Sequence, residues 1–103
     1  MIPTQFLTDV ASVQHYQGKT PSGVKWSQPI VYQCRFDVDS TRVKTSKGEE
    51  FTRSGTFFFN PHHGLVNLPL ESKIVFEGKD YIVKQIEVLK TELGIDHIEV
   101  GVV

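Results

Sequence analysis

The strongest constraint on the fold is the alternation of apolar and polar residues in short segments of the chain. In residues 97–102 this alternation places Ile98, Val100 and Val102 on one side of an extended backbone. The 3.6-residue period of a helix is weak throughout. Further segments with strand character are 11–17, 30–37, 51–59 and 72–89. The chain is therefore predicted to be all-β, a small antiparallel β-barrel or sandwich of about five to seven strands, and no segment has the clear period of a helix.

Residues 30–37 predict which side chains of their strand face the core. Ile30, Tyr32, Cys34 and Phe36 fall on one face, and polar residues occupy most of the other. A lone cysteine on an apolar face is usually a small buried hydrophobic residue, so we do not expect Cys34 to be a nucleophile. As the only cysteine, it cannot form a disulfide within the chain, which is typical of a reducing compartment.

Residues 72–89 predict a hairpin with a two-residue turn at Gly78-Lys79. Glycine in the first position suits a type II′ turn. In this register three apolar pairs face each other: Phe76 with Tyr81, Ile74 with Val83, and Val75 with Ile82. The alternative turn at Glu77-Gly78 would place Phe76 opposite Lys79, so the apolar pairs favour the first register.

A polar segment at residues 38–50 is predicted to be a long mobile loop between early strands. It contains too few apolar side chains to offset the entropy cost of ordering it. Loops of this length in compact domains are often functional. This one carries Arg42, Lys44 and Lys47. With the flanking arginines there are five positive charges against four negative ones, a weak signal for nucleic acid, and a plain solvated loop is the competing interpretation.

The densest stretch, Phe57-Phe58-Phe59 followed by Asn60-Pro61, predicts a strand that ends in a turn. Proline cannot donate to a β-ladder, and Asn-Pro favours a turn. On a strand, Phe57 and Phe59 share one face and Phe58 takes the other. In the hairpin, Val75 and Ile82 likewise add apolar surface to a second face. A small sheet that is apolar on both faces indicates a closed barrel or a surface covered by a partner. We therefore predict a protein interface at three residues: Phe58, Val75 and Ile82.

The histidines and carboxylates form no recognisable catalytic or metal-binding pattern. His62 and His63 are adjacent and would point to opposite sides of an extended segment, which disfavours a shared metal. One cysteine cannot supply a typical structural zinc site. Asp37 and Asp39 lack a second acidic pair. We expect surface turn histidines, no catalytic residues, no metal and no cofactor, and a protein that is not an enzyme.

Length and composition indicate one domain spanning residues 1–103. A formal net charge of -1 provides no general attraction to nucleic acid and little repulsion between copies. The opening residues lack the basic and apolar regions of a signal peptide. No apolar run reaches the ~18 residues of a membrane helix. We expect a soluble protein made inside the cell, without a membrane partner.

The hairpin sequence at residues 74–83, the closing strand at 97–100 and the Met1-Ile2-Pro3 opening resemble the small minor capsid proteins of tailed phages and prophages. These in turn resemble the head-closure, or stopper, proteins of long-tailed phage connectors. The resemblance extends over nearly the whole length as a pattern. The histidines at 62 and 63 do not belong to it.

The resemblance implies a structural subunit of a phage head–tail connector, located in the neck of the virion and assembled in the host bacterial cytoplasm. Copies would form a 6- or 12-fold ring below the portal and its adaptor, and the ring would continue the DNA channel. The partners would be the adaptor, the tail terminator or tail tube, and packaged double-stranded DNA. The loop at 40–50 would reach into the channel and help to retain DNA through Arg42, Lys44 and Lys47.

Two other functions compete with this one. A tail terminator or tail-completion protein would also assemble as a ring. A small nucleic-acid-binding barrel would need aromatic residues interleaved with basic ones on a sheet face, and Phe57-Phe58-Phe59 lacks that interleaving.

Overall fold

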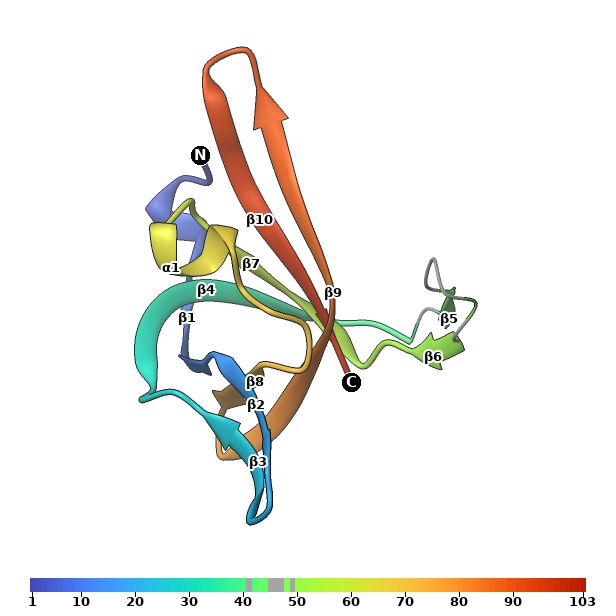
Figure 1. Cartoon of the computed structure of the whole chain (residues 1–103). Coiled ribbons are helices and arrows are strands. Elements are labelled where there is room, and N and C mark those ends of the chain that lie inside the picture. The colour runs from blue at the N-terminus through green and yellow to red at the C-terminus, as the bar shows by residue number, and fades with distance from the viewer. Residues whose placement is uncertain (41, 45–47, 49) are drawn as a thin grey trace.

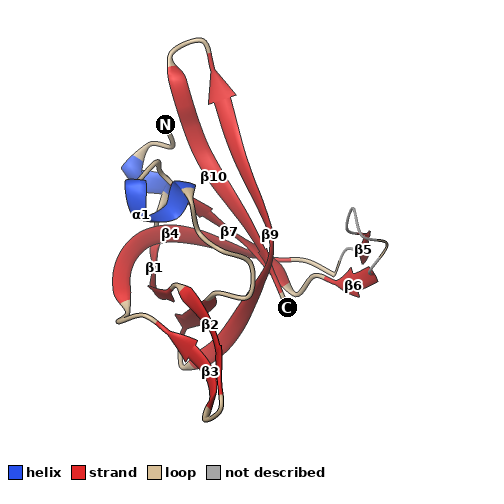
Figure 2. Ribbon diagram, viewed as in Figure 1, coloured by secondary structure: helices blue, strands red, loops and turns tan. Residues whose placement is uncertain are grey.

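The computed structural model describes residues 1–40, 42–44, 48 and 50–103. Six strands form a closed antiparallel barrel in the order β1-β4-β7-β10-β9-β8 (Figure 1 and Figure 2). They are β1 Asp9–Gln14, β4 Ile30–Val38, β7 Gly55–Phe59, β8 Lys73–Phe76, β9 Lys79–Thr91 and β10 Gly94–Val102. The predicted all-β class is confirmed, and of the two predicted architectures the barrel is the one that forms.

Three hairpin arms leave the barrel in different directions (Figure 1). The β2–β3 arm pairs β2 Tyr16–Thr20 with β3 Gly23–Trp26, and the β5–β6 arm pairs β5 Arg42–Lys44 with β6 Glu50–Thr52. The β9–β10 arm, residues 87–99, lies mostly beyond β7, because β10 pairs with β7 only from Ile98 onward. In Figure 1 the β9–β10 arm rises above the barrel and the β2–β3 arm hangs below it.

The barrel interior is filled by the inward residues of every strand. No solvent reaches Phe57, Phe59, Ile98, Val100 or Val102. An aromatic cluster of Phe36, Phe57, Phe76 and Tyr81 has ring centroids 4.4 to 5.6 Å apart. The faces predicted for residues 57–59 and 97–102 are therefore confirmed, and so is the burial of Cys34.

The segment predicted as one strand at 11–17 is divided into β1 and β2. Between them, the His15 backbone N–H donates to Ser27 Oγ at 2.9 Å, and the Tyr16 N–H donates to the buried Ser72 Oγ at 2.9 Å. These side-chain acceptors replace ladder partners and redirect the chain out of the barrel. Alternation of apolar residues alone cannot reveal such a break.

The segment predicted as one strand at 51–59 is also divided, into β6 and β7. The Ser54 N–H donates to the Val102 carbonyl at 2.7 Å, which brings the chain back to the barrel. Gly55 then passes directly under Phe36, where an added Cβ would lie 2.5 Å from the ring. As predicted, the strand ends before Asn60-Pro61.

The predicted register of the β8–β9 hairpin is wrong by two residues. Phe76 pairs with Lys79 and Ile74 with Tyr81, so the turn is Glu77-Gly78. Both turn residues have positive φ, 50° and 77°, as a type I′ turn requires, and its twist matches that of the strands. This register also removes the like-charge pair that the other one would create between Glu77 and Asp80.

Two short helical segments also occur that the sequence did not predict. A 3-10 turn, η1 Thr4–Phe6, lies near the N-terminus, and a short helix, α1 His63–Val66, follows β7. His62 caps α1, its Nδ1 accepting from the Gly64 N–H at 3.0 Å. The reason for the helix is tertiary, since Leu65 and the following Leu68 are buried against the barrel core. Among the described residues, no helix is long and apolar enough to cross a membrane.

The segment 38–50 is not the plain loop that was predicted. Arg42 pairs with Thr52 and Lys44 with Glu50, so part of it forms the β5–β6 arm. Residues 41, 45–47 and 49 lie outside the described residues. Lys47, for which a DNA contact was predicted, is one of them.

Candidate interaction surfaces

The cations predicted to contact DNA lie on the β5–β6 arm. Arg42 and Lys44 are both exposed on β5, and Glu50 stands opposite Lys44 on β6. At the base of the arm, Arg53 forms an ion pair with Asp39 at 2.9 Å and donates to Gln85 Oε1 at 3.2 Å. The arm is thus tied to β9 through Arg53, while its outer part presents both signs of charge.

The three residues of the predicted interface do not form one patch. Phe58 lies on β7, whereas Val75 and Ile82 lie on β8 and β9, and three strand-to-strand steps separate β7 from β8 in either direction around the barrel. Val75 and Ile82 are diagonal neighbours on adjacent strands. Ile82 pairs with Lys73, which lies two residues before Val75 on β8. All three side chains are half-buried.

Phe58 belongs to a groove that the N-terminal segment borders. The Ile2 N–H donates to Asn60 Oδ1 at 2.7 Å, and Asn60 Nδ2 donates to the Ile2 carbonyl at 3.0 Å. The lining residues are Ile2, Phe6, Arg35, Asp37, Phe58 and His97. Ile2 and Phe6 of the N-terminal segment therefore line the same groove as Phe58.

His97 is held between two carboxylates at the edge of this groove. Its Nδ1 lies 2.6 Å from Asp96 Oδ2, and its Nε2 lies 3.0 Å from Glu99 Oε2. Partial burial lowers the pKa of His97, but the hydrogen bonds to Asp96 and Glu99 outweigh it, so the pKa is raised. From the sequence, residue 97 was predicted only as the start of a strand, although the Asp-His-x-Glu spacing contains both partners of His97.

A second concave surface, the Trp26 pocket, lies where the β2–β3 arm meets β9. Its lining residues are Tyr16, Lys19, Val24, Trp26, Glu71 and Ile82. Trp26 Nε1 donates to the Glu71 carbonyl at 3.1 Å, and Lys73 Nζ lies 4.4 Å from the centre of the indole ring. The indole is held in place from two sides, so the pocket is pre-formed.

The Trp26 pocket was not predicted from the sequence. Trp26 is the only tryptophan, and it lies within residues 10–34, which contain lysines but no acidic residue. A tryptophan in a segment without acidic residues was the feature of the sequence that could have indicated a binding surface here. Of the predicted interface residues, Ile82 lines this pocket.

The other histidines make local contacts, and the cysteine is buried. His62 and His63 do not point to opposite sides, because α1 stacks their rings with centroids 4.3 Å apart. His15 Nε2 lies 2.6 Å from the Gly64 carbonyl. Burial, and then the charge of Asp9, raises the pKa of Cys34 to about 12. Within the described part of the chain, no three His, Cys, Asp or Glu residues come together as a metal site would require.

Comparisons with other proteins leave the family open. No protein-family model matches this sequence, and no curated protein matches it significantly.

Proposed function

We propose that the chain is a structural subunit of a phage head–tail connector, a head-closure ring in the neck of the virion. The observation that carries the proposal is the shape: a closed barrel with three hairpin arms that extend away from it. A closed barrel has no free sheet edge, so side-chain surfaces and arms are what it offers to neighbours. Such a body suits a repeated subunit in a ring.

The sequence resemblance supports the same function. The stretches that resemble phage minor capsid proteins lie in one part of the barrel: residues 74–83 form most of β8 and the start of β9, and residues 97–100 lie in the middle of β10, which pairs with β9. In the proposed ring, the subunits continue the DNA channel below the portal and adaptor, and one face receives the tail terminator or tail tube. The β5–β6 arm is the proposed channel element, with Arg42, Lys44 and Lys47 near DNA phosphates.

The test is to delete the gene from the phage or prophage that encodes it and to examine the particles. We expect the protein in purified virions, in the neck density of an electron cryomicroscopy map. Without it, heads should package DNA but lose it, and tails should not attach. Absence of the protein from virions would overturn the proposal.

The deletion and a DNA-binding measurement distinguish the connector from the two alternative functions. If the protein is a tail terminator, its deletion should leave DNA-filled heads and alter the tails instead. If it is a nucleic-acid-binding barrel, the purified protein should bind DNA with an affinity that falls steeply as salt rises.

A further inference from the structure

The tip of the β9–β10 arm exposes a leucine that has no packing role in the monomer. Leu93 is 100% exposed. The tip is nevertheless ordered, because Thr91 Oγ1 accepts from the Leu93 N–H at 3.2 Å and donates to the Gly94 carbonyl at 3.4 Å. A large apolar side chain held at the end of a projecting hairpin is suited to insertion into a pocket of another molecule.

The Trp26 pocket has the matching chemistry. Four of its lining residues are apolar or aromatic: Tyr16, Val24, Trp26 and Ile82. The charge at its rim is positive, because Lys19 lines it while Glu71 is neutralised by Lys84 at 2.6 Å.

The charges of the two sites are complementary. The β9–β10 arm, residues 87–99, carries four acidic residues against one lysine. Asp96 and Glu99 are paired with the N-terminal ammonium or His97 toward the barrel, so the negative charge at the tip comes from Glu92, beside Leu93. Residues 10–34, which include the β2–β3 arm, carry Lys19 and Lys25 and no acidic residue. The arm of one copy and the pocket of another would therefore attract each other.

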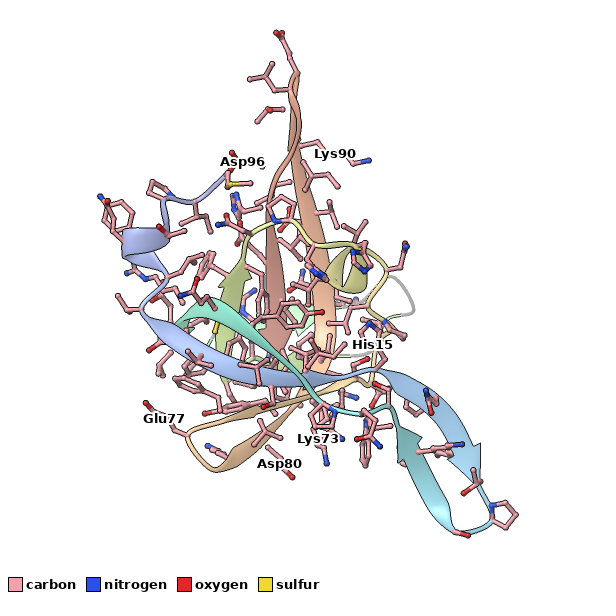
Figure 3. All side chains as sticks on the ribbon, turned by 90° about the vertical axis from the view of Figure 1, so that its left-hand side faces the viewer. His15, Lys73, Glu77, Asp80, Lys90 and Asp96 are labelled. Carbon is pink, nitrogen blue, oxygen red and sulfur yellow. The ribbon has the colours of Figure 1, made fainter. Side chains whose placement is uncertain are left out.

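The two sites lie toward opposite ends of the molecule, so one copy cannot join them within itself. In Figure 3, Lys90 and Asp96 of the β9–β10 arm lie toward the upper end, and Lys73, which covers Trp26, lies in the lower part. A contact between unlike surfaces is heterologous, and repeating it produces a ring or an open filament.

We propose that Leu93 of one copy inserts into the Trp26 pocket of the next, with Glu92 beside Lys19. The partner is a second copy of this chain, bound head to tail. As the contact between subunits of a neck ring, this inference rests on the proposed function; as a contact between two copies, it can be tested on the purified protein.

Disulfide trapping tests the contact directly. One sample of full-length protein carries Leu93→Cys and a second, differently tagged sample carries Val24→Cys. Mixed at about 1 mM, where a contact with a millimolar Kd is about half formed, they are oxidised gently. Buried Cys34 should not compete, since no solvent reaches it. We expect a disulfide between the two tags.

The matched control replaces Val24→Cys by Val38→Cys, at a residue that is 80% exposed and outside the pocket. Equal trapping at Val38 would overturn the proposal, and so would a predominance of Leu93→Cys homodimers, which would mean that tips meet tips. A charge exchange adds specificity. Lys19→Glu or Glu92→Lys alone should slow trapping about threefold, as for an exposed ion pair, and the two together should restore it.

A second measurement needs no cysteine. Trp26 is the only tryptophan, so its fluorescence reports the pocket. Dilution from about 1 mM should shift the emission of the native chain, while Leu93→Ser should show the diluted spectrum at every concentration. Identical behaviour of the two proteins would overturn the contact.

The outcomes separate this inference from the proposed function. If the disulfide forms but the protein is absent from virions, the contact between copies is supported and the connector function is refuted. If the protein is located in the neck but shows neither disulfide trapping nor a fluorescence shift, the connector function is supported and the contact between copies is refuted.

Discussion

At the scale of single residues, His97 should make stability depend on pH. Its folded pKa is raised above the unfolded value of about 6.5, so folding favours the protonated form. The stabilisation is therefore fully present below about pH 6.5 and is lost as pH rises through the folded pKa. Because the site is partly exposed, we expect about 0.5 kcal/mol or less.

The measurement is urea unfolding of the native chain and of His97→Gln between about pH 5.5 and pH 8.5, a range that brackets the histidine titration. The difference in unfolding free energy should shrink as pH rises. His63→Gln, at an exposed position of α1, is the matched control. A difference that grows with pH would contradict the assignment.

Two neighbouring phenylalanines should differ sharply in their effect on stability. Phe57 is fully buried in the aromatic cluster, whereas Phe58 is half-buried on the outer wall. Phe57→Ala should cost about 3–5 kcal/mol, from lost burial and a cavity, and Phe58→Ala about 1 kcal/mol. Denaturant melts of both variants test this, and similar costs would show that the two faces are assigned wrongly.

At the scale of elements, the turn of the β8–β9 hairpin distinguishes the two registers. Glu77 holds a positive φ, which costs about 1 kcal/mol for a residue of this kind, and Asn-Gly is the preferred type I′ pair. Glu77→Asn should therefore stabilise the protein by about 0.5 kcal/mol, and Gly78→Val should destabilise it by more. Thermal unfolding measures both changes. A destabilising Glu77→Asn would instead favour the turn at Gly78-Lys79.

The β5–β6 arm should be dispensable for folding. Replacing residues 41–49 by a short glycine linker leaves the Arg53–Asp39 ion pair at its base, and loop length enters the closure entropy only logarithmically. We expect little change in unfolding free energy but faster loss of DNA from tailless heads. Normal DNA retention would remove the channel role, and an unfolded variant would show that the arm supports the core. Lys44→Gln in the intact arm is the milder comparison.

At the scale of the whole molecule, the protein should be largely monomeric in dilute solution. A single exposed leucine and one pocket form a contact far smaller than a stable interface of about 1,200 Å². Sedimentation at micromolar concentration should show a species near 11.7 kDa. Assembly would then need a partner that aligns many copies, so that weak contacts multiply. A stable ring in isolation would contradict this template-driven assembly.

The alternation of apolar and polar residues was sufficient to predict most of the core-facing side chains, although Ile30 is exposed, and Asn60-Pro61 was sufficient to predict the end of β7. Alternation with a period of two assigned Phe57, Phe59, Ile98 and Val100 to the interior, because any antiparallel partner would bury the same face. Asn60-Pro61 ended β7 for a local reason, the missing N–H of proline.

The register of the β8–β9 hairpin, the closure of the barrel and the Trp26 pocket depend on contacts between distant segments, which no local pattern contains. Two registers that differ by two residues bury the same face, so alternation cannot distinguish them, and the backbone twist of the Glu77-Gly78 turn selected one. The break after Gln14 depends on acceptors in Ser27 and Ser72, far along the chain. The Trp26 pocket likewise joins segments that meet only once the barrel has closed, and no local pattern can specify such a contact.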